Sequence, residues 1–383
     1  MSASGATVQL TVQQEDLNRG LSAVARAVPP LSTLPLTKNI LLVADDDQLS
    51  VSASVAVTMA FTERIASGIT EAGTITLPSR LLSDFVATLP PQPIDIALAE
   101  RSRQVSLSCA RNEASIGGQA ADEFPPIPPV EDGDTIRLDA DALRKSINQV
   151  AFAAATDDSR PVLTGVHFAL RDGSLRLAAA DGFRLAVNTI EVGENSSDRE
   201  AIVPARALNE LARLLPEVTE TISVTFNPAG TQVLFDLGHA TLVAQLIQGT
   251  FPNYEQLIPS GHATSTEVSV GEFMRETRIA SIFARDGSGI VRLIASPGEG
   301  STGRLTVTAR AEEVGNNEGE IDALVDGEEA RIAFNSRYLI EVLGALDTDR
   351  VAIETSSPSS PGVLRPVGND DYVHVVMPMF VQW

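Results

Sequence analysis

The sequence is poor in cysteine and in aromatic residues. Its single cysteine, Cys109, excludes an internal disulfide and suits a reducing compartment. We expect Cys109 to be a buried structural thiol rather than a reactive one. Aromatic residues make up only 4% of the 383 residues, so small and branched aliphatic side chains must fill the cores. No apolar run approaches the roughly 18 residues that a membrane-spanning helix needs. The first residues also lack the basic and then apolar order of a secretory signal. These absences predict a cytoplasmic protein.

Recognisable catalytic and metal-binding motifs are also lacking. The four histidines are scattered and pair with no spaced carboxylates or cysteines, which argues against a zinc site: His167, His239, His262 and His374. No nucleophile elbow, phosphate-binding loop or dinucleotide fingerprint is present. Asp45–Asp47 is most simply a turn, with a divalent-metal role as the alternative. Asp181 and Arg184 read as an Asp-Gly hairpin with a local salt bridge. The sequence therefore predicts no enzyme and no cofactor; a strand-rich hydrolase using these carboxylates is the rival hypothesis.

Positive charge is scarce as well. The chain has 28 Lys and Arg residues against 50 Asp and Glu, which gives a net charge of −22. Proteins that bind polyanions usually present a basic face. The overall balance therefore argues against nucleic-acid binding, unless the few cations are concentrated in one place.

The chain contains internal repeats of a strand followed by a helix. A short strand followed by a helix with one apolar face occurs at residues 8–28, 136–154 and 268–283. The apolar helix positions correspond between the copies: Leu17, Leu21 and Val24; Leu143, Ile147 and Val150; Phe273, Thr277 and Ala280. Thr277 makes the third stripe the weakest. A second strand and helix recur at residues 74–89, 201–215 and 331–346, with Pro78, Pro204 and Asn335 at the helix starts.

Strand-like alternation follows both helices in each copy. The first two copies close on similar phrases, DEFPPIP at Asp122–Pro128 and GTFPNYEQLIP at Gly249–Pro259. We therefore predict an α+β fold of three similar domains, at residues 1–130, 131–261 and 262–383, each with two helices and many strands.

The basic residues gather on the predicted helices. One position of the first helix is occupied by Arg19, Lys145 and Arg275, and one position of the second by Arg80, Arg206 and Arg337. The six helices also carry Arg26, Arg144, Arg213 and Arg278. With ten basic and eight acidic residues, the helices have a net charge of +2, and the rest of the chain carries −24.

A solvated helix face would also carry charge, but it does not predict the same sign at the same place in every copy. If the helices of several domains face a common centre, the repeated cations line it. Such a lining contacts phosphates and does not read bases, since reading a sequence needs side chains in a groove. The pattern thus favours loose, non-specific binding of double-stranded DNA.

Four segments carry a resemblance to a known family along nearly the whole chain. They are DDSRPVLTGV (Asp157–Val166), AADGFRLAV (Ala179–Val187), GTFPNYEQLIP and YVHVVMPM (Tyr372–Met379). In this order and spacing they resemble the bacterial DNA polymerase III β subunit, or β sliding clamp, family. The resemblance implies three similar domains per chain, helices inside and sheets outside, and two chains joined head to tail into a ring that acts as a processivity factor in DNA replication.

The resemblance also implies a groove that accepts short peptides from the replicative polymerase, the clamp loader and repair proteins. Carried over by position, its residues are Arg160, Leu163, Ala180, Gly182, Phe183, Arg184, Leu185, Pro252, Gln256, Leu257, Val375, Val376, Met377, Pro378 and Met379. Flexible thioethers among aliphatic side chains suit varied ligands. Arg160 and Arg184 are candidates to bond the peptide. Without the family, Tyr372–Met379 would read as a plain core strand.

Ring closure, by the same carry-over, joins an edge strand holding Val105 and Leu107 to the region of Ile282 and Phe283.

Some features depart from the family pattern. Phe183 stands where a histidine is expected. An apolar stretch, residues 29–36, replaces an expected basic loop, so Lys38 is the candidate DNA contact there. The acidic stretch 298–329 and the tail 380–383 have no assigned role, although Trp383 could pack over the groove. A clamp paralogue specialised for repair or drug resistance remains an alternative.

Overall fold

A computed structural model describes residues 8–26, 28, 38–55, 58–98, 103–126, 129–130, 133–192, 198–218, 220–284, 289–300, 302–311 and 315–383. By their internal contacts the residues form two compact units. The first comprises Met1–Asp141 and Glu210–Leu246, and the second Ala142–Asn209 and Ile247–Trp383.

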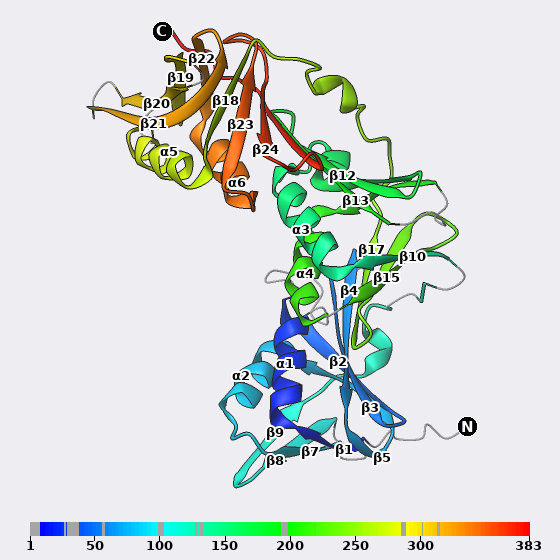
Figure 1. The fold of residues 1–383 in the computed structure, drawn as a ribbon. Helices are drawn as coiled ribbons and strands as arrows, with labels where there is room; N and C mark the ends of the chain where they lie inside the picture. The colour runs from blue at the N-terminus through cyan, green and yellow to red at the C-terminus, as the bar shows by residue number, and fades with distance from the viewer. Residues whose placement is uncertain are drawn as a thin grey trace. The chain divides into compact units, whose positions relative to one another are not determined.

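The predicted repeat is present in the order of helices and strands (Figure 1). The first copy is β1 (Gln9–Gln13), α1 (Gln14–Ala25), β2 (Asn39–Asp45), β3 (Gln48–Val55), β4 (Met59–Ala66), the extra β5 (Gly68–Glu71), β6 (Gly73–Pro78), α2 (Ser79–Thr88), β7 (Pro93–Leu98), β8 (Gln104–Cys109) and β9 (Asn112–Gly117). The second is β10 (Asp134–Asp139), α3 (Ala140–Val150), β11 (Gly165–Arg171), β12 (Ser174–Ala180), β13 (Arg184–Glu191), β14 (Arg199–Pro204), α4 (Ala205–Leu214), β15 (Thr221–Phe226), β16 (Gln232–Asp236) and β17 (Ala240–Gln245). The third is β18 (Thr264–Ser269), α5 (Val270–Ala284), β19 (Ile290–Pro297), β20 (Thr302–Ala311), β21 (Gly315–Gly327), β22 (Ala330–Asn335), α6 (Ser336–Ala345), β23 (Arg350–Thr355), β24 (Gly362–Pro366) and β25 (Tyr372–Val376).

Each copy uses the same antiparallel pairings. The strand before the first helix pairs with the strand after the second, as in β1 with β7, β10 with β15 and β18 with β23. The strand after the first helix pairs with the strand before the second, as in β2 with β6, β11 with β14 and β19 with β22. The helices cover one face, where Leu17, Leu21 and Val24 of α1 are fully buried. Each such side chain contributes about 1.5–3 kcal/mol of burial energy.

Successive copies are joined by antiparallel strand pairing, and the pairing has the same pattern at both junctions. The last strand of the second copy, β17, pairs with β4, and the last strand of the third, β25, pairs with β13. The two junctions match bond for bond: Arg64 N donates to His239 O as Thr189 N does to Asp371 O. Likewise, Gln245 N donates to Thr58 O as Met377 N does to Phe183 O. By this register, Glu63 and Asn188 are equivalent residues, opposite Ala240 and Tyr372.

Several predictions about local structure are confirmed. Asp45–Asp47 forms the turn between β2 and β3. Cys109 is buried, and Asn335 caps α6 by accepting a hydrogen bond from Arg337 N. The acidic stretch 298–329, which had no assigned role, contributes the long hairpin of β20 and β21. Its alternating burial pattern is that of strands with one solvated face.

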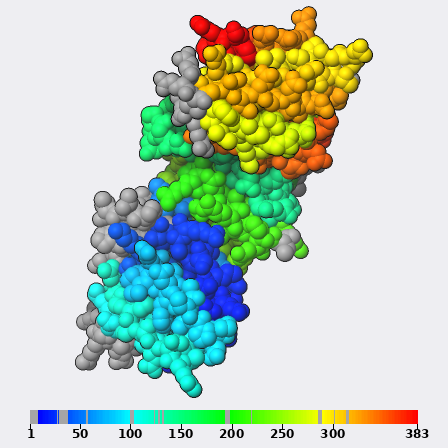
Figure 2. Space-filling view, turned by 90° about the vertical axis from the view of Figure 1, so that its left-hand side faces the viewer, coloured from blue at the N-terminus to red at the C-terminus, as the bar shows by residue number. Residues whose placement is uncertain are grey.

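The C-terminal tail lies against the third copy, where Figure 2 shows it in red beside the orange and yellow surface. Met379 N donates to Ala333 O on β22, and Arg292 donates to Gln382 O over 3.5 Å. These two contacts hold the backbone of the tail on the third copy's sheet. Phe380 remains 91% exposed.

A buried carboxyl group lies where β4 meets β17. Glu63 is 2% exposed beneath α1, where Gly20 leaves room for it: a Cβ on Gly20 would come within 3.2 Å of Glu63 Cγ. Burial and the nearby Glu217 carboxylate raise the pKa of Glu63 to about 7, against the opposing effect of Arg19 and Arg64. The chain therefore folds more readily when the carboxyl group of Glu63 is protonated than when it is ionised.

Replacing Glu63 with glutamine is expected to flatten the pH dependence of stability. The pKa of Glu63 rises from 4.5 to about 7 on folding, so its contribution is fully present below pH 4.5 and is lost as the pH rises through 7. We expect the wild-type chain to lose about 1–3 kcal/mol of unfolding free energy more than Glu63→Gln between pH 5 and pH 8. Urea unfolding at a series of pH values measures this. Equal slopes for the two proteins would show that Glu63 does not titrate on folding.

Candidate peptide-binding groove and nucleic-acid-facing helices

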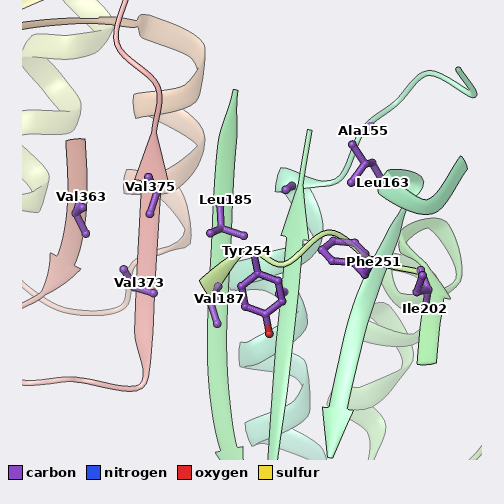
Figure 3. Close-up of a cluster of buried hydrophobic side chains, with 12 residues drawn as sticks. Ala155, Leu163, Leu185, Val187, Ile202, Phe251, Tyr254, Val363, Val373 and Val375 are labelled. Carbon is purple, nitrogen blue, oxygen red and sulfur yellow. The ribbon is translucent and has the colours of Figure 1, made fainter. Parts of the chain in front are cut away.

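The centre of the predicted groove is an apolar cluster in the second unit (Figure 3). Leu163, Ala180, Leu185 and Val375, four of the predicted residues, are all buried in it. Leu185 and Val375 are directly opposite each other on β13 and β25, so the cluster spans the junction of the second and third copies. Eight further members were not predicted: Ala155, Ala178, Val187, Ile202, Phe251, Tyr254, Val363 and Val373. Val187 and Val373 could have been found from their period-two spacing to Leu185 and Val375.

The rim of this cluster exposes apolar side chains. Phe183 is 58% exposed, Leu257 55% and Met377 45%. Phe183 and Met377 are neighbours, since Met377 N donates to Phe183 O over 2.8 Å. Predicted residues that are also exposed are Arg160, Gly182, Pro252 and Gln256, while Pro378 and Met379 are half-buried. Exposed apolar side chains around a buried apolar floor suit the anchoring of a partner's hydrophobic residue.

The predicted peptide-binding role of Arg184 stays a prediction, but in this structure its side chain is already occupied within its own chain. Its side chain is almost fully buried and its guanidinium is bonded to its own chain: Nε to Asp181 Oδ2 over 3.1 Å, a second nitrogen to Phe152 O over 2.7 Å and a third to Glu341. It also stacks on Tyr338. Residues directly opposite each other across paired strands face the same side, so Arg184 and its opposite residue Val376 face away from Leu185 and Val375.

The Asp-Gly hairpin prediction, by contrast, is confirmed. Asp181 accepts from the backbone N–H groups of Phe183 and Arg184, and Gly182 has a φ of +92°. Arg160 covers this turn, donating to Asp181 O over 2.8 Å. Arg160 is exposed and remains the predicted guanidinium at the groove.

The predicted DNA-facing cations are mostly exposed, and all of them except Arg26 and Lys38 lie on helices. Arg80 is 95% exposed, and the other members of the two repeated positions are exposed as well: Arg19, Lys145, Arg206, Arg275 and Arg337. Lys38, Arg26, Arg213 and Arg278 are exposed, while Arg144 is half-buried. The apolar stretch 29–36 lies outside the described residues. Because the helices occupy equivalent places, the repeated cations lie on the same face of each copy.

Most of these cations have a carboxylate partner. Arg19 pairs with Asp16 over 3.0 Å, Lys145 with Asp347 over 2.7 Å and Arg337 with Glu341 over 3.7 Å. Exposed ion pairs of this kind contribute about 0–1 kcal/mol. Pairs this weak can be displaced by competing anions such as phosphates.

The predicted edge strand for ring closure is wrong. Val105 and Leu107 lie on β8, which pairs with both β7 and β9, and both side chains are buried in the core of the first copy. Among the described residues, the edge strands of this sheet are β5 and β9, and β9 is the one next to β8. The alternating pattern of β8 does not distinguish an inner strand from an outer one, which explains the error. On α5, Ile282 is 59% exposed and Phe283 is half-buried.

A hollow of about 590 Å³ in the second unit was not predicted. The ring of His167 stacks on Phe251 there, 5.2 Å between centroids. Burial lowers the pKa of His167, although Glu200 acts in the opposite direction. The arginines that line the hollow are already paired with carboxylates, Arg171 with Glu200 and Arg176 with Glu255. Its charges are therefore largely compensated internally.

Metal and membrane features can be stated for the described part of the chain. None of its groups of three or more His, Cys, Asp or Glu side chains is arranged to hold a metal ion. None of its helices has the length and apolar character of a membrane span.

Comparisons with known proteins agree with the three copies. Models of the DNA polymerase III beta subunit match in order: the N-terminal domain at residues 8–128, the central domain at 137–253 and the C-terminal domain at 255–380. The beta sliding clamp of Synechococcus elongatus is 32% identical over 376 residues, 97% of this chain and 99% of that protein. The solved sliding clamp of Bacillus subtilis superposes with a TM-score of 0.91 at 26% identity, covering 98% of this chain and 100% of that one. The Pseudomonas aeruginosa beta subunit superposes with a TM-score of 0.90 at 29% identity, covering 97% and 100%.

Three tandem copies of one α+β unit, with helices on one face and antiparallel sheets on the other, define the DNA-clamp class of fold. The chain belongs to the DNA polymerase III beta subunit family, the bacterial beta sliding clamps.

Proposed function

We propose that this chain is a DNA sliding clamp of three domains, at residues 1–130, 131–261 and 262–383. Two copies form a non-catalytic ring in the cytoplasm that encircles duplex DNA and tethers the replicative polymerase, the clamp loader and repair proteins. The observation that supports this most is the repeated junction. This junction occurs twice within the chain, between the first and second copies and between the second and third. The first and third copies also each carry one half of the same junction, for which the described residues provide no partner strand.

The unused halves follow from the shared register. On β21, Gly315–Gly319 is equivalent to Met59–Glu63 and Arg184–Asn188. On β9, Asn112–Ile116 is equivalent to Ala240–Ala244 and Tyr372–Val376. Among the described residues, this part of β21 pairs only with β20, and β9 only with β8. A second copy therefore fits head to tail, with Asn112 opposite Gly319 and Ile116 opposite Gly315.

Apolar side chains on the neighbouring helices complement this seam. At the internal junction a small hollow is lined by Ala23 of α1, by Arg26, which directly follows α1, and by Leu214 of α4. Helices α5 and α2 are the equivalents of α1 and α4, and Ile279 and Ile282 replace Ala23 and Arg26. These isoleucines are exposed, as is Leu81 on α2. Covering them with a second copy removes an exposed apolar surface from water.

The proposal is tested by retention on DNA of two shapes. A closed ring stays on circular duplex and leaves when that duplex is linearised, because only the topology holds it. We expect the loaded protein to remain on nicked circles and to be lost after a single cut. Equal retention on both forms would contradict the proposal. Gene context and essentiality would separate a replicative clamp from a repair or drug-resistance paralogue.

Changing Met377 to lysine is expected to weaken peptide binding at the groove strongly. A charged side chain on the exposed rim must be desolvated when an apolar peptide residue docks, so we expect affinity for polymerase-derived peptides to fall by about tenfold or more. Fluorescence anisotropy with a labelled peptide measures it. Met377 is suitable because it is exposed, whereas a charge at buried Leu185 would unfold the second copy. Glu255→Lys, outside the predicted set, is the control. Unchanged affinity in Met377→Lys would show that the groove lies elsewhere.

A further inference from the structure

The first and third copies both place a carboxyl group between the first helix and the sheet. In the first copy the carboxyl group comes from the strand, and in the third it comes from the helix. In the first copy, Glu63 projects from the strand beneath Gly20 of the helix. In the third, the strand has Gly319 at the position of Glu63, and the helix has Glu276 at the position of Gly20. The Glu276 carboxylate lies directly over Gly319, where any side chain would collide with it. The second copy has a neutral amide instead, Asn188, which donates to Gln149 Oε1 over 2.8 Å.

The surroundings of the two carboxyl groups differ because one junction is complete and the other is open. Glu63 is covered by β17 and is 2% exposed. The side chain of Glu276 is 14% exposed, with Arg275 Nε 3.1 Å away. Arg275 is the equivalent of Arg19, one of the two cations near Glu63. When a second copy supplies β9, Glu276 acquires the covering that Glu63 already has.

Few charges from the second copy would face Glu276. Its β9 brings the uncharged Asn112 opposite Gly319, and its α2 brings Asp84, the equivalent of Glu210. At the position of Glu217 it has Pro91. From its own chain, Glu318 and Glu320 lie on the opposite face of β21 to Gly319, since successive side chains alternate. Arg275 is therefore the cation that faces this carboxylate, and Asp84 opposes it.

The outer face of the seam places two more carboxylates against each other. In the inferred register Glu113 of one copy is directly opposite Glu318 of the other. Their in-chain neighbours on the adjoining strands are Ser108 and Thr308. The flanking charges are Arg111, opposite Glu320, and Arg310, two residues along β20 from Thr308. Like charges directly opposite on paired strands are destabilising.

We propose that closing the ring is coupled to proton uptake by these carboxyl groups, so that the ring tightens as the pH falls. The inference rests on the proposed ring and concerns only the chemistry of its seam. A carboxylate that is desolvated, or brought against another, binds a proton more readily in the dimer than in the free chain. The closed ring then carries more protons than two separate chains, and its dissociation constant rises with pH. Each ring has two identical seams, which doubles the effect.

The test is the dimer dissociation constant from sedimentation of a labelled chain, at constant ionic strength between pH 5.5 and pH 8.5. We expect the wild-type constant to rise by about tenfold or more from pH 6 to pH 8, since each proton taken up contributes up to tenfold per pH unit. The double variant Glu276→Gln/Glu318→Gln is expected to bind at pH 8 about as tightly as the wild type does at pH 6, with a nearly flat profile.

Two controls separate the seam from the rest of the chain. Glu272→Gln, on the exposed start of the same helix, should keep the wild-type profile, as should Glu63→Gln at the internal junction. A wild-type constant that changes less than twofold, or a double variant with the wild-type slope, would overturn the inference. A chain that stays monomeric at every pH would instead overturn the ring itself.

Discussion

Replacing Glu318 with proline is expected to convert the dimeric ring into a monomer. At the internal junction, Arg64 N–H points across to β17. Glu320 is its equivalent, and alternation puts Glu318 N–H on the same open edge. Proline removes this donor and places its ring against the incoming strand. An unpaired buried group costs about 1–3 kcal/mol, and with two seams per ring we expect dimer affinity to fall about 100-fold or more.

The pairing of β21 with β20 is not disturbed by this change, because the lost N–H points the other way. Glu318→Ala, which keeps the donor, is the matched control and should remain dimeric. Sedimentation velocity at micromolar and nanomolar concentrations distinguishes the two. A Glu318→Pro chain that stays dimeric would show that β21 is not the ring-closing edge.

Removing the three repeated arginines of the second helices is expected to weaken DNA association strongly. Arg80, Arg206 and Arg337 are exposed at one equivalent position, so a dimer loses six cations from the helix face. Each lost phosphate contact reduces the slope of log affinity against log salt by about 0.9. We therefore expect the triple glutamine variant to bind duplex at least about tenfold more weakly near 0.1 M salt, with a flatter salt dependence.

The control removes the same number of cations from the sheets. Arg171, Arg199 and Arg304 lie on β11, β14 and β20, and their triple glutamine variant should bind duplex as the wild type does. Anisotropy of a labelled duplex over a salt series measures both proteins. If the two triple variants lose affinity equally, net charge and not the helix face determines binding.

The repeat made the fold predictable from the sequence. Six helices and the strands around them were located because apolar residues recur at the same spacing in three copies, and the predicted segments end within a few residues of the observed helices. Phe152 is an example: it lies in the segment predicted at residues 136–154, but the α-helix ends at Val150, and a tighter turn follows at Ala151–Ala153. Fraying of the last turn into 3₁₀ geometry is not encoded in the apolar pattern.

The site was less predictable, because a strand's apolar alternation does not show what each face of the strand packs against or whether its side chains are exposed. Arg184 and Leu185 are adjacent in sequence and both buried, yet one faces the helices and the other the apolar cluster. Val105 and Leu107 alternate as any half-buried strand does, so only the register of β8 between β7 and β9 showed them to be internal. The carboxyl of Glu276 over Gly319 depends on contacts between residues more than 40 positions apart, which no local pattern specifies.

The register of the seam is the most direct test of the account. Ala114 and Asn317 are opposite each other in it, at the equivalent of the pair Leu242 and Phe61, on the more closely spaced type of antiparallel pair. Cysteines at both positions should form a disulfide between copies on mild oxidation, giving a covalent dimer in non-reducing electrophoresis. Cysteines at Ala114 and Glu318, one residue out of register and on the opposite face, should not. Efficient cross-linking of the shifted pair, or none with the matched pair, would contradict a ring closed by repetition of the internal junction.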